Sequence, residues 1–483
     1  MIGLTTHKMQ DFLKNPELWK SKICDECIDD EAIIVLNRLL GRCNDIMIEY
    51  PYYDDEYLST YYLFYAKKYL SFPKECYRIH LFDDENLYAG FITLRPTVGE
   101  TKIGKSYISP KLFLDGDDYV MDNEYCVHVM GKDIVLHAIP WMKQDTDIAV
   151  CGHVATWIAM KAAHLRGITA SDLLMGELVK AIPEIDGRMI PTSAISVRQM
   201  VSALSKFGFS PVNIQKTPSD YYSSDGEEFQ TFQNELFAYI ESRIAPIVCI
   251  GTSEHAVAAV GHGRVNYEKL DSEFKGRKIV YFGELLETVI EHDDAQQPYL
   301  EVDYKKNINA FTSSLEPGNI GVPAYYIEDF DRMIVPLRDR IQYSFKSLVI
   351  RIKDYIDAEQ EKVLRKDQQY VERVYLVSSN DLKKYVSDSS EIDPVYRQTI
   401  LGMNFPIHVW CVDFSTFAEY KEKKMSVKFI VDTTACNKAE TPFLLIQTPW
   451  DVMFFEDGKA RKYQREIAPY AIYRGNLERG YDT

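Results

Sequence analysis

One cysteine stands where its thiol can act as a nucleophile. Cys151 opens the apolar run CGHVATWIAMKAAHL, which predicts a helix over residues 151–165 that Gly167 ends. The positive end of a helix dipole favours the thiolate, the attacking form of cysteine. Gln144 lies seven residues upstream, where its side-chain amide and the backbone N–H of Cys151 are suited to stabilising an oxyanion. We therefore predict that Cys151 is the reactive one of the nine cysteines.

A histidine and a pair of acidic residues follow this cysteine. His255 opens the strand-like run HAVAAVG, so its imidazole is expected to project from a sheet toward a helix packed on it. In VIEHDDAQQPY, Asp293 or Asp294 lies at a strand end and is placed to accept from the imidazole Nδ1–H. Asp271 is a third candidate, but its charged segment KLDSEFKGRK is typical of a solvated hairpin tip. We prefer Asp293 as the residue that orients His255.

The order Gln, Cys, His, Asp resembles the papain-like cysteine peptidases, and within them the bacteriocin-leader (double-glycine) peptidase branch. The similar motifs are Gln, Cys-Gly-x-Ala at a helix start, His-Ala-Val in a strand, and Asp near Pro-Tyr, over residues 131–300. The resemblance implies a nucleophile helix packed on a small antiparallel sheet. It also implies that Gln144 is the oxyanion donor, Cys151 the nucleophile, His255 the base, and Asp293 or Asp294 the orienting acid.

The resemblance implies a thiol hydrolase that cleaves a peptide or isopeptide bond in a protein or peptide substrate. Two alternatives stay open. The same residues suit acyl transfer to an amine or deamidation of a Gln side chain, because these reactions share the covalent intermediate. A papain-like fold can also serve as a binding or scaffold protein without turnover. No cofactor or metal is expected, and the oligomeric state is left open.

Several other motifs carry weaker chemistry. Residues 99–106, GETKIGKS, match the phosphate-loop pattern from Gly99 to Ser106, with Lys105 as its lysine. Pro110 and the alternating residues after the motif argue against the helix that a phosphate loop requires, so nucleotide binding is a minor alternative. His153, two residues after the cysteine, is expected to be a surface histidine. Cys24 and Cys27 form a single C-x-x-C, and with no second ligand pair in the sequence zinc binding is not favoured.

Composition limits the remaining classes of function. The 483 residues include 55 Lys and Arg against 72 Asp and Glu, a net charge of −17, which argues against nucleic acid as the main partner. The start of the chain lacks the apolar core of a secretory signal, and no stretch reaches the ~18 apolar residues of a membrane span. Nine scattered cysteines make a poor disulfide framework. These features predict a soluble cytoplasmic protein.

The pattern of elements predicts an α+β protein with three units. Residues 1–130 are expected to form an α+β unit that is helical to about residue 75 and β-rich afterwards. Residues 131–325 are expected to form the papain-like core, with helices over 151–165, 171–181, 196–206 and 228–243 and strands over 245–251, 255–261 and 278–292. Residues 326–483 are expected to form an α/β unit that starts with a long helix over 344–369. No functional motif stands out in the two flanking units.

Overall fold

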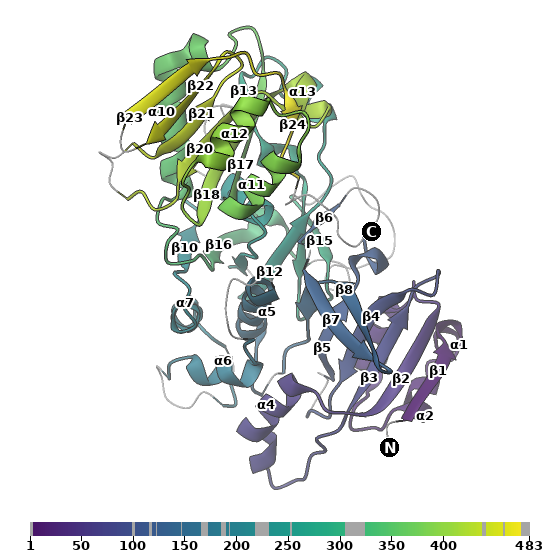
Figure 1. Cartoon of the computed structure of the whole chain (residues 1–483). Helices are drawn as coiled ribbons and strands as arrows, with labels where there is room; N and C mark the ends of the chain where they lie inside the picture. Colours follow the sequence, from purple (N-terminus) through teal and green to yellow (C-terminus); the bar gives the residue numbers. More distant parts are fainter. Residues whose placement is uncertain are drawn as a thin grey trace.

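The chain folds as an α+β protein around three large sheets. In Figure 1 they follow one another through the molecule, from the purple N-terminal sheet to the green and yellow C-terminal sheet. This computed structural model describes residues 3–98, 102–114, 118–121, 123–145, 147–165, 172–184, 190–192, 194–217, 231–251, 254–304, 324–436, 441–456 and 459–474. Within these ranges, no helix has the length and apolar character needed to cross a membrane.

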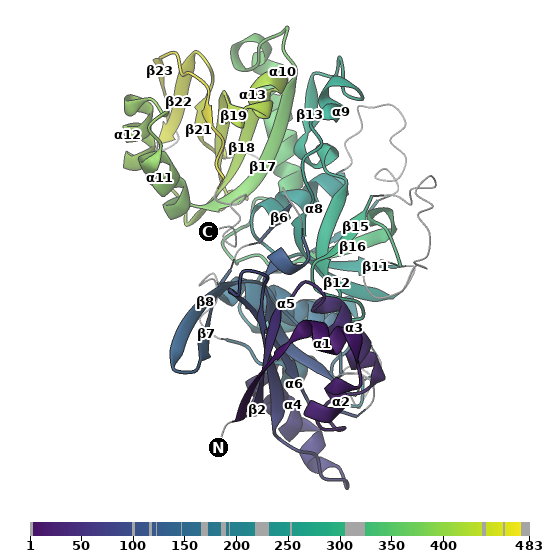
Figure 2. The ribbon, with the colours of Figure 1, turned by 90° about the vertical axis from the view of Figure 1, so that its right-hand side faces the viewer.

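The first sheet is antiparallel and has the strand order β1-β2-β3-β4-β5-β9. Three helices pack on it, as Figure 2 shows, and their side chains, among them Trp19 and Leu36, share a core with Ile79 of the sheet. The Asp29 side chain accepts from the Ala32 N–H at 2.8 Å and so caps the third of these helices. The elements are β1 (Gly3–Lys8), α1 (Met9–Lys14), α2 (Leu18–Lys22), α3 (Asp30–Leu39), β2 (Asp45–Tyr52), β3 (Cys76–Phe82), β4 (Tyr88–Leu94), β5 (Ile103–Ile108) and β9 (Pro140–Trp141). The hairpin β7 (Glu124–Val129) and β8 (Lys132–His137) forms a separate two-stranded sheet.

The first 75 residues contain more strand than the helical periodicity predicts. β1 precedes the first helix, and β2 occupies residues 45–52, part of the stretch expected to be helical. Only α3 and α4 (Asp55–Leu63) form helices of nine residues or more in residues 3–75. β2 pairs with β1 on one side and β3 on the other. Pairing with strands distant in sequence therefore overrides the local helical pattern.

The second sheet carries the candidate site and is antiparallel throughout, in the order β10-β16-β11-β12-β14-β15, with β6 also paired to β12. Its strands are β6 (Tyr119–Val120), β10 (Val212–Gln215), β11 (Ile247–Ile250), β12 (His255–His262), β14 (Thr288–His292), β15 (Leu300–Asp303) and β16 (Phe330–Val335). The predicted strand over 278–292 is interrupted by the 3-10 helix η4 (Phe282–Leu285).

Helices pack around this second sheet close to where the sequence predicts them. They are α5 (Cys151–Leu165), α6 (Met175–Ala181), α7 (Val197–Lys206) and α8 (Thr231–Glu241), followed by the short α9 (Glu268–Asp271). α5 lies directly against β12. The expected stop at Gly167 lies outside the described residues. The start of α5 and the start of β12 are thus placed to meet.

The third sheet has the order β13-β17-β18-β20-β21-β22-β23 and is antiparallel except for the pair β13 and β17. Because its other neighbouring strands are antiparallel, the C-terminal unit is α+β. The alternation of strands and helices in the sequence predicted an α/β unit instead. The elements are β13 (Ile279–Tyr281), α10 (Phe345–Val363), β17 (Tyr370–Ser378), α11 (Ser379–Asp388), α12 (Pro394–Gly402), β18 (His408–Thr416), α13 (Phe417–Lys421), β20 (Val427–Asp432), β21 (Phe443–Gln447), β22 (Asp451–Glu456) and β23 (Lys459–Gln464), with β19 (Lys424–Met425) paired to β24 (Tyr470–Ala471).

The sheets exchange strands across the expected unit boundaries. β16 starts at Phe330, beyond the boundary expected at residue 325, and lies in the second sheet between β10 and β11. β13 lies before that boundary but pairs with β17 of the third sheet. The largest core cluster extends from Tyr57 to Ile446 and includes side chains from all three expected units. The candidate site is therefore built into a continuous interior.

Candidate active site

The start of α5 is held by a buried histidine that follows the cysteine. The Nδ1 of His153 accepts from the Val150 N–H at 3.3 Å, and the His153 N–H donates to the Val150 carbonyl at 2.9 Å. His153 is 1% exposed, so the expected surface histidine is wrong. Burial lowers the pKa of His153 to about 4, which keeps the ring neutral and its Nδ1 able to accept. His153 therefore caps the helix that carries Cys151.

Gly152 lets this helix start approach the segment before α7. A Cβ atom added at Gly152 would lie 2.7 Å from Cγ1 and 3.1 Å from Cδ1 of Ile195, and 3.2 Å from Sδ of Met200. Real Cβ atoms essentially never come as close as the first of these contacts. The residue after Cys151 must therefore be very small for the nucleophile helix to keep its position.

The loop before α5 is closed on itself and tied to the first sheet. Asp145 and Ala149 exchange two backbone hydrogen bonds, of 2.8 and 2.7 Å, and the Asp145 carboxylate accepts from the Tyr65 hydroxyl at 2.7 Å. Arg95 donates to the backbone carbonyl of Gln144 at 3.3 Å. Within the described ranges, these contacts hold Gln144 through its backbone, and its side chain is half-buried. The oxyanion role of Gln144 stays a prediction.

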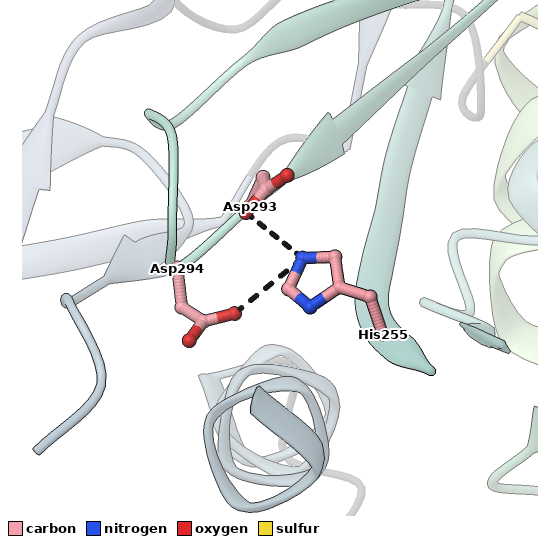
Figure 3. A group of neighbouring side chains, drawn as sticks. All are labelled: His255, Asp293 and Asp294. Atoms are coloured by element: carbon pink, nitrogen blue, oxygen red, sulfur yellow. Dashed lines mark hydrogen bonds and ion pairs between the residues drawn. The ribbon is translucent and has the colours of Figure 1, made fainter. Parts of the chain in front are cut away.

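His255 stands between the thiol and the acidic loop. Its Nε2 lies 3.0 Å from Oδ1 of Asp293 and 3.9 Å from Oδ1 of Asp294, and Figure 3 shows the other ring nitrogen on the side of the ring away from Asp293. The Cys151 side chain lies close enough to this imidazole to raise its pKa. An ionised carboxylate only accepts, so Nε2 carries the proton toward Asp293, and Nδ1 is left to face the thiol. The expected bond from Nδ1 to the aspartate is therefore wrong in the choice of nitrogen.

Asp293 is the most strongly hydrogen-bonded carboxylate of the site. Its Oδ1 accepts from the backbone N–H groups of Ala295 at 2.8 Å and Gln296 at 3.1 Å, and its Oδ2 accepts from the Tyr325 hydroxyl at 2.9 Å. Burial opposes ionisation, but the bonds and charge from His255, Tyr325 and the loop amides hold the pKa of Asp293 below its ordinary value. Asp293 is therefore an anion that orients His255.

A tryptophan from the first sheet fixes the acidic loop. The indole N–H of Trp141 donates to the Asp293 backbone carbonyl at 2.9 Å. The Asp293 N–H donates to the backbone carbonyl of Gln297, four residues later in the loop, at 3.1 Å. One residue earlier, His292 makes a 3.1 Å contact from Nδ1 to the Pro140 carbonyl. The N-terminal sheet thus contributes directly to the position of Asp293.

Asp294 and Glu291 are buried without comparable partners. Oδ2 of Asp294 and Oε2 of Glu291 are buried and have no hydrogen-bond partner. Burial raises the pKa of Asp294 to about 7 and that of Glu291 to about 8. The Tyr325 hydroxyl contacts both Glu291 and Asp293 and so links the two carboxylates, donating its single proton to one of them at a time. Asp293 and Asp294 are adjacent in sequence but differ in the charge that their surroundings favour.

The electrostatics of the site favour a protonated imidazole. Burial opposes protonation, but hydrogen bonds with Asp293 and Cys151 and the nearby carboxylate charges outweigh it and raise the pKa of His255 to about 11. A cationic imidazole beside a thiol stabilises the thiolate. Cys249 on β11 is close enough to Cys151 for their charges to interact, but burial raises the pKa of Cys249 to about 12. The two neighbouring thiols are therefore expected to differ in reactivity.

The same acidic loop offers ligand atoms for a cation. One ligand atom each from His255, Asp293 and Asp294 lies within 4.8 Å of the others. Oδ2 of Asp294 is the buried acceptor without a partner, and either a proton or a cation would satisfy it. The bonds already made by Asp293 to His255 and two loop amides favour the proton, because they occupy the oxygen nearest the histidine.

The remaining sequence candidates lie elsewhere. Asp271 ends α9, is exposed and pairs with Lys421 at 2.6 Å, so it belongs to a helix and not to the expected hairpin tip. Gly99 lies outside the described residues, whereas Lys105 and Ser106 lie inside β5. Lys105 is buried and pairs with Asp54 at 3.3 Å and with Asp55. A lysine in a strand, held by carboxylates, is not placed as the lysine of a phosphate loop is, so the described part of the motif gives the nucleotide alternative no support.

Sequence reasoning missed several residues of the site. Tyr325 lies 32 positions after Asp293, Trp141 comes from β9 of the first sheet, and Arg95 directly follows β4. None of these residues belongs to a motif near Cys151 or His255. The chain has 33 tyrosines and five tryptophans, and no sequence feature separates Tyr325 and Trp141 from those that only pack in the core.

Comparisons with protein-family models, with curated proteins and with solved structures find no match for this chain. The resemblance to papain-like peptidases therefore rests on the sequence motifs alone.

Proposed function

We propose that the chain is a papain-like thiol hydrolase that cleaves a peptide or isopeptide bond in a protein or peptide substrate. One observation carries this proposal. The half-buried Cys151 at the start of α5 lies close enough to His255 to raise the pKa of the imidazole, and Nε2 of His255 is bonded at 3.0 Å to the buried carboxylate of Asp293. A nucleophile, a base and a group that orients the base are the parts that covalent catalysis by cysteine requires.

The proposed reaction starts with attack of the Cys151 sulfur on the substrate carbonyl carbon. The oxyanion accepts from the Cys151 N–H, which has no intrahelical acceptor at the first position of a helix, and from the Gln144 side-chain amide. His255 then gives its proton to the leaving amine, and the carbon–nitrogen bond breaks. The products of this step are the amine and a thioester on Cys151.

Water completes the cycle. His255, now neutral, takes a proton from water as the oxygen attacks the thioester carbon. Collapse of the second tetrahedral intermediate breaks the carbon–sulfur bond, releases a carboxylic acid and returns Cys151 to its starting state. Asp293 stays ionised throughout and holds the imidazole so that Nδ1 faces the sulfur.

Selective alkylation tests the pairing of Cys151 with His255. Native full-length protein is treated with limiting iodoacetamide, and the modified cysteines are mapped by mass spectrometry. We expect Cys151 to react before Cys249, its neighbour on β11, because the pKa of Cys249 is raised to about 12. In His255→Ala the labelling of Cys151 should slow by about tenfold or more, because the cation that stabilises the thiolate is gone. Labelling of Cys151 that is no faster than that of Cys249, or a rate that is unchanged in His255→Ala, would contradict the proposal.

Turnover is tested with a degenerate synthetic peptide library. New peptide N-termini should appear with the wild-type chain, should be absent with Cys151→Ser, and should persist in the presence of EDTA. Release of ammonia without new N-termini would show that the chain deamidates Gln side chains and does not cleave the main chain. Loss of cleavage in EDTA would indicate that His255, Asp293 and Asp294 bind a cation that cleavage requires.

A further inference from the structure

Cys24 and Cys27 lie in a tight turn between α2 and α3. The Cys27 N–H donates to the Cys24 carbonyl at 2.9 Å and closes a four-residue turn. The ends of such a turn lie within about 7 Å, close to the Cα separations of about 4.4–6.8 Å that disulfides span. Each thiol shifts the pKa of the other, so the two side chains lie close together. The turn therefore holds the two sulfurs where a disulfide can form with little movement of the backbone.

The two thiols differ in burial and in the charge that they favour. Cys27 is 1% exposed within the core of the first sheet, whereas Cys24 is half-buried at the edge of that core. The hydrogen bond from Cys27 lowers the pKa of Cys24 to about 7. The same contact, with burial, raises the pKa of Cys27. An accessible thiolate beside a buried protonated thiol is the arrangement of an attacking and a resolving cysteine.

The surroundings of the turn favour a dithiol over a metal site. Across the described ranges, the one group of three metal-ligating side chains lies at His255, far along the chain from this turn. Cys76 interacts with the charge of Cys27 but does not complete such a group. Tyr50 and Tyr77, whose rings stack at 4.3 Å, both interact with the charge of Cys24, so the pair is flanked by aromatic rings.

We propose that Cys24 and Cys27 form a redox-active dithiol that exchanges with low-molecular-weight disulfides such as glutathione disulfide. The Cys24 thiolate attacks one sulfur of the disulfide, a mixed disulfide forms, and one thiolate leaves. That thiolate takes the proton of Cys27, whose sulfur attacks Sγ of Cys24 and expels the second thiolate. Two electrons pass from the protein to the small disulfide, which becomes one thiol and one thiolate, and one disulfide forms in the turn.

The test uses reduced full-length protein exposed to glutathione disulfide without reductant. After acid quenching and alkylation with N-ethylmaleimide, trypsin releases residues 23–38, which contain Cys24, Cys27 and no other cysteine. We expect this peptide to be lighter by two hydrogen atoms, with neither glutathione nor N-ethylmaleimide attached. The exposed Cys126, alone in its tryptic peptide, should keep a bound glutathione and serves as the single-thiol control.

Two matched variants separate the roles of the cysteines. In Cys27→Ser, Cys24 should retain one glutathione because no thiol resolves it. In Cys24→Ser, modification of Cys27 should slow by about tenfold or more, because a buried thiol reacts slowly. A wild-type peptide that keeps glutathione, or that stays reduced while Cys126 is modified, would overturn the proposal. The wild-type result is decisive even if a serine variant folds poorly, and it does not depend on Cys151.

Discussion

Two adjacent carboxylates, Asp293 and Asp294, carry different charge because their hydrogen bonds differ. Asp293 accepts from His255, from Tyr325 and from two loop amides, and these donors stabilise its anion. Asp294 has a buried oxygen with no partner, and burial raises its pKa to about 7. In the proposed mechanism, only Asp293 fixes the ring of His255 in the orientation that points Nδ1 at the thiol.

We expect Asp293→Asn to lower kcat/KM by about 10²–10⁴-fold, the range that a positioned acid or base contributes. The amide removes the charge that stabilises the imidazolium, so the loss should fall on kcat. Asp294→Asn is the matched control, and its loss should stay below about tenfold because that side chain is not the primary partner of His255. The measurement is steady-state cleavage of a peptide from the library. Equal losses in the two variants would remove the distinction between the carboxylates.

At the scale of single elements, the close packing of α5 against the segment before α7 positions the nucleophile. Gly152→Ala should lower stability by about 1–3 kcal/mol, the usual cost of overpacking, and should also reduce the alkylation rate of Cys151. The reason is the 2.7 Å approach of the added Cβ to Ile195. Gly402→Ala, where a Cβ would meet nothing within 4 Å, is the control. Thermal unfolding and alkylation are measured together, and Ile195→Ala should restore both in the Gly152→Ala background.

Glu291, on β14 behind the acidic loop, makes stability depend on pH. Its pKa is about 8 in the folded chain because of burial, against an ordinary value of 4.5. Between these two pH values the folded state holds a proton that the unfolded chain has lost, so the contribution of Glu291 to stability falls as the pH rises. Glu291→Gln removes this proton and keeps an acceptor for Tyr325.

The melting temperature of Glu291→Gln relative to wild type should therefore rise steadily from pH 4.5 to pH 8. Glu287→Gln is the control, because Glu287 is partly exposed, pairs with Lys269 at 2.9 Å and has a lowered pKa. Its difference from wild type should not rise over that window. A flat difference for Glu291→Gln would show that this carboxyl is ionised in the folded chain at neutral pH.

At the scale of the whole molecule, a fully buried charge cluster joins the second and third sheets. Glu241 on α8 accepts from Arg373 on β17 at 2.9 Å and lies 2.7 Å from Nε2 of His262 on β12. Arg373 also donates to the Tyr473 carbonyl at 3.0 Å, near the end of the described chain. These contacts connect the strand that begins with His255 to the C-terminal unit.

We expect Arg373→Met to destabilise the chain by about 3–5 kcal/mol, because it leaves Glu241 buried without its cation. Lys421→Met is the control, since the exposed pair of Lys421 and Asp271 joins the same two parts of the molecule and should matter by about 0–1 kcal/mol. Denaturant unfolding measures both. Recovery of stability in Arg373→Met with Glu241→Gln would assign the loss to the unpaired charge, and no recovery would assign it to packing.

Local patterns predicted the elements that carry the reactive groups. The helix over residues 151–165 and the strand that starts at His255 form as predicted, because their apolar runs and their length suit a buried helix and a buried strand. The same reasoning was wrong for β2, whose strand state depends on partners at both edges. It was also wrong for His153, which was expected at the surface. The residues next to His153 in the sequence do not show that its ring is buried and accepts from the Val150 N–H.

The candidate thiol, imidazole and carboxylates follow from residue type and from position at the start or end of an element, so they can be named without a structure. Which of Asp293, Asp294 and Asp271 contacts His255, and through which ring nitrogen, is visible only in the folded chain. That choice depends on distances across sheets and on donors such as Tyr325 and Trp141, which are remote in the chain. Hydrogen bonds and burial act through space, so no pattern of neighbouring residues contains them.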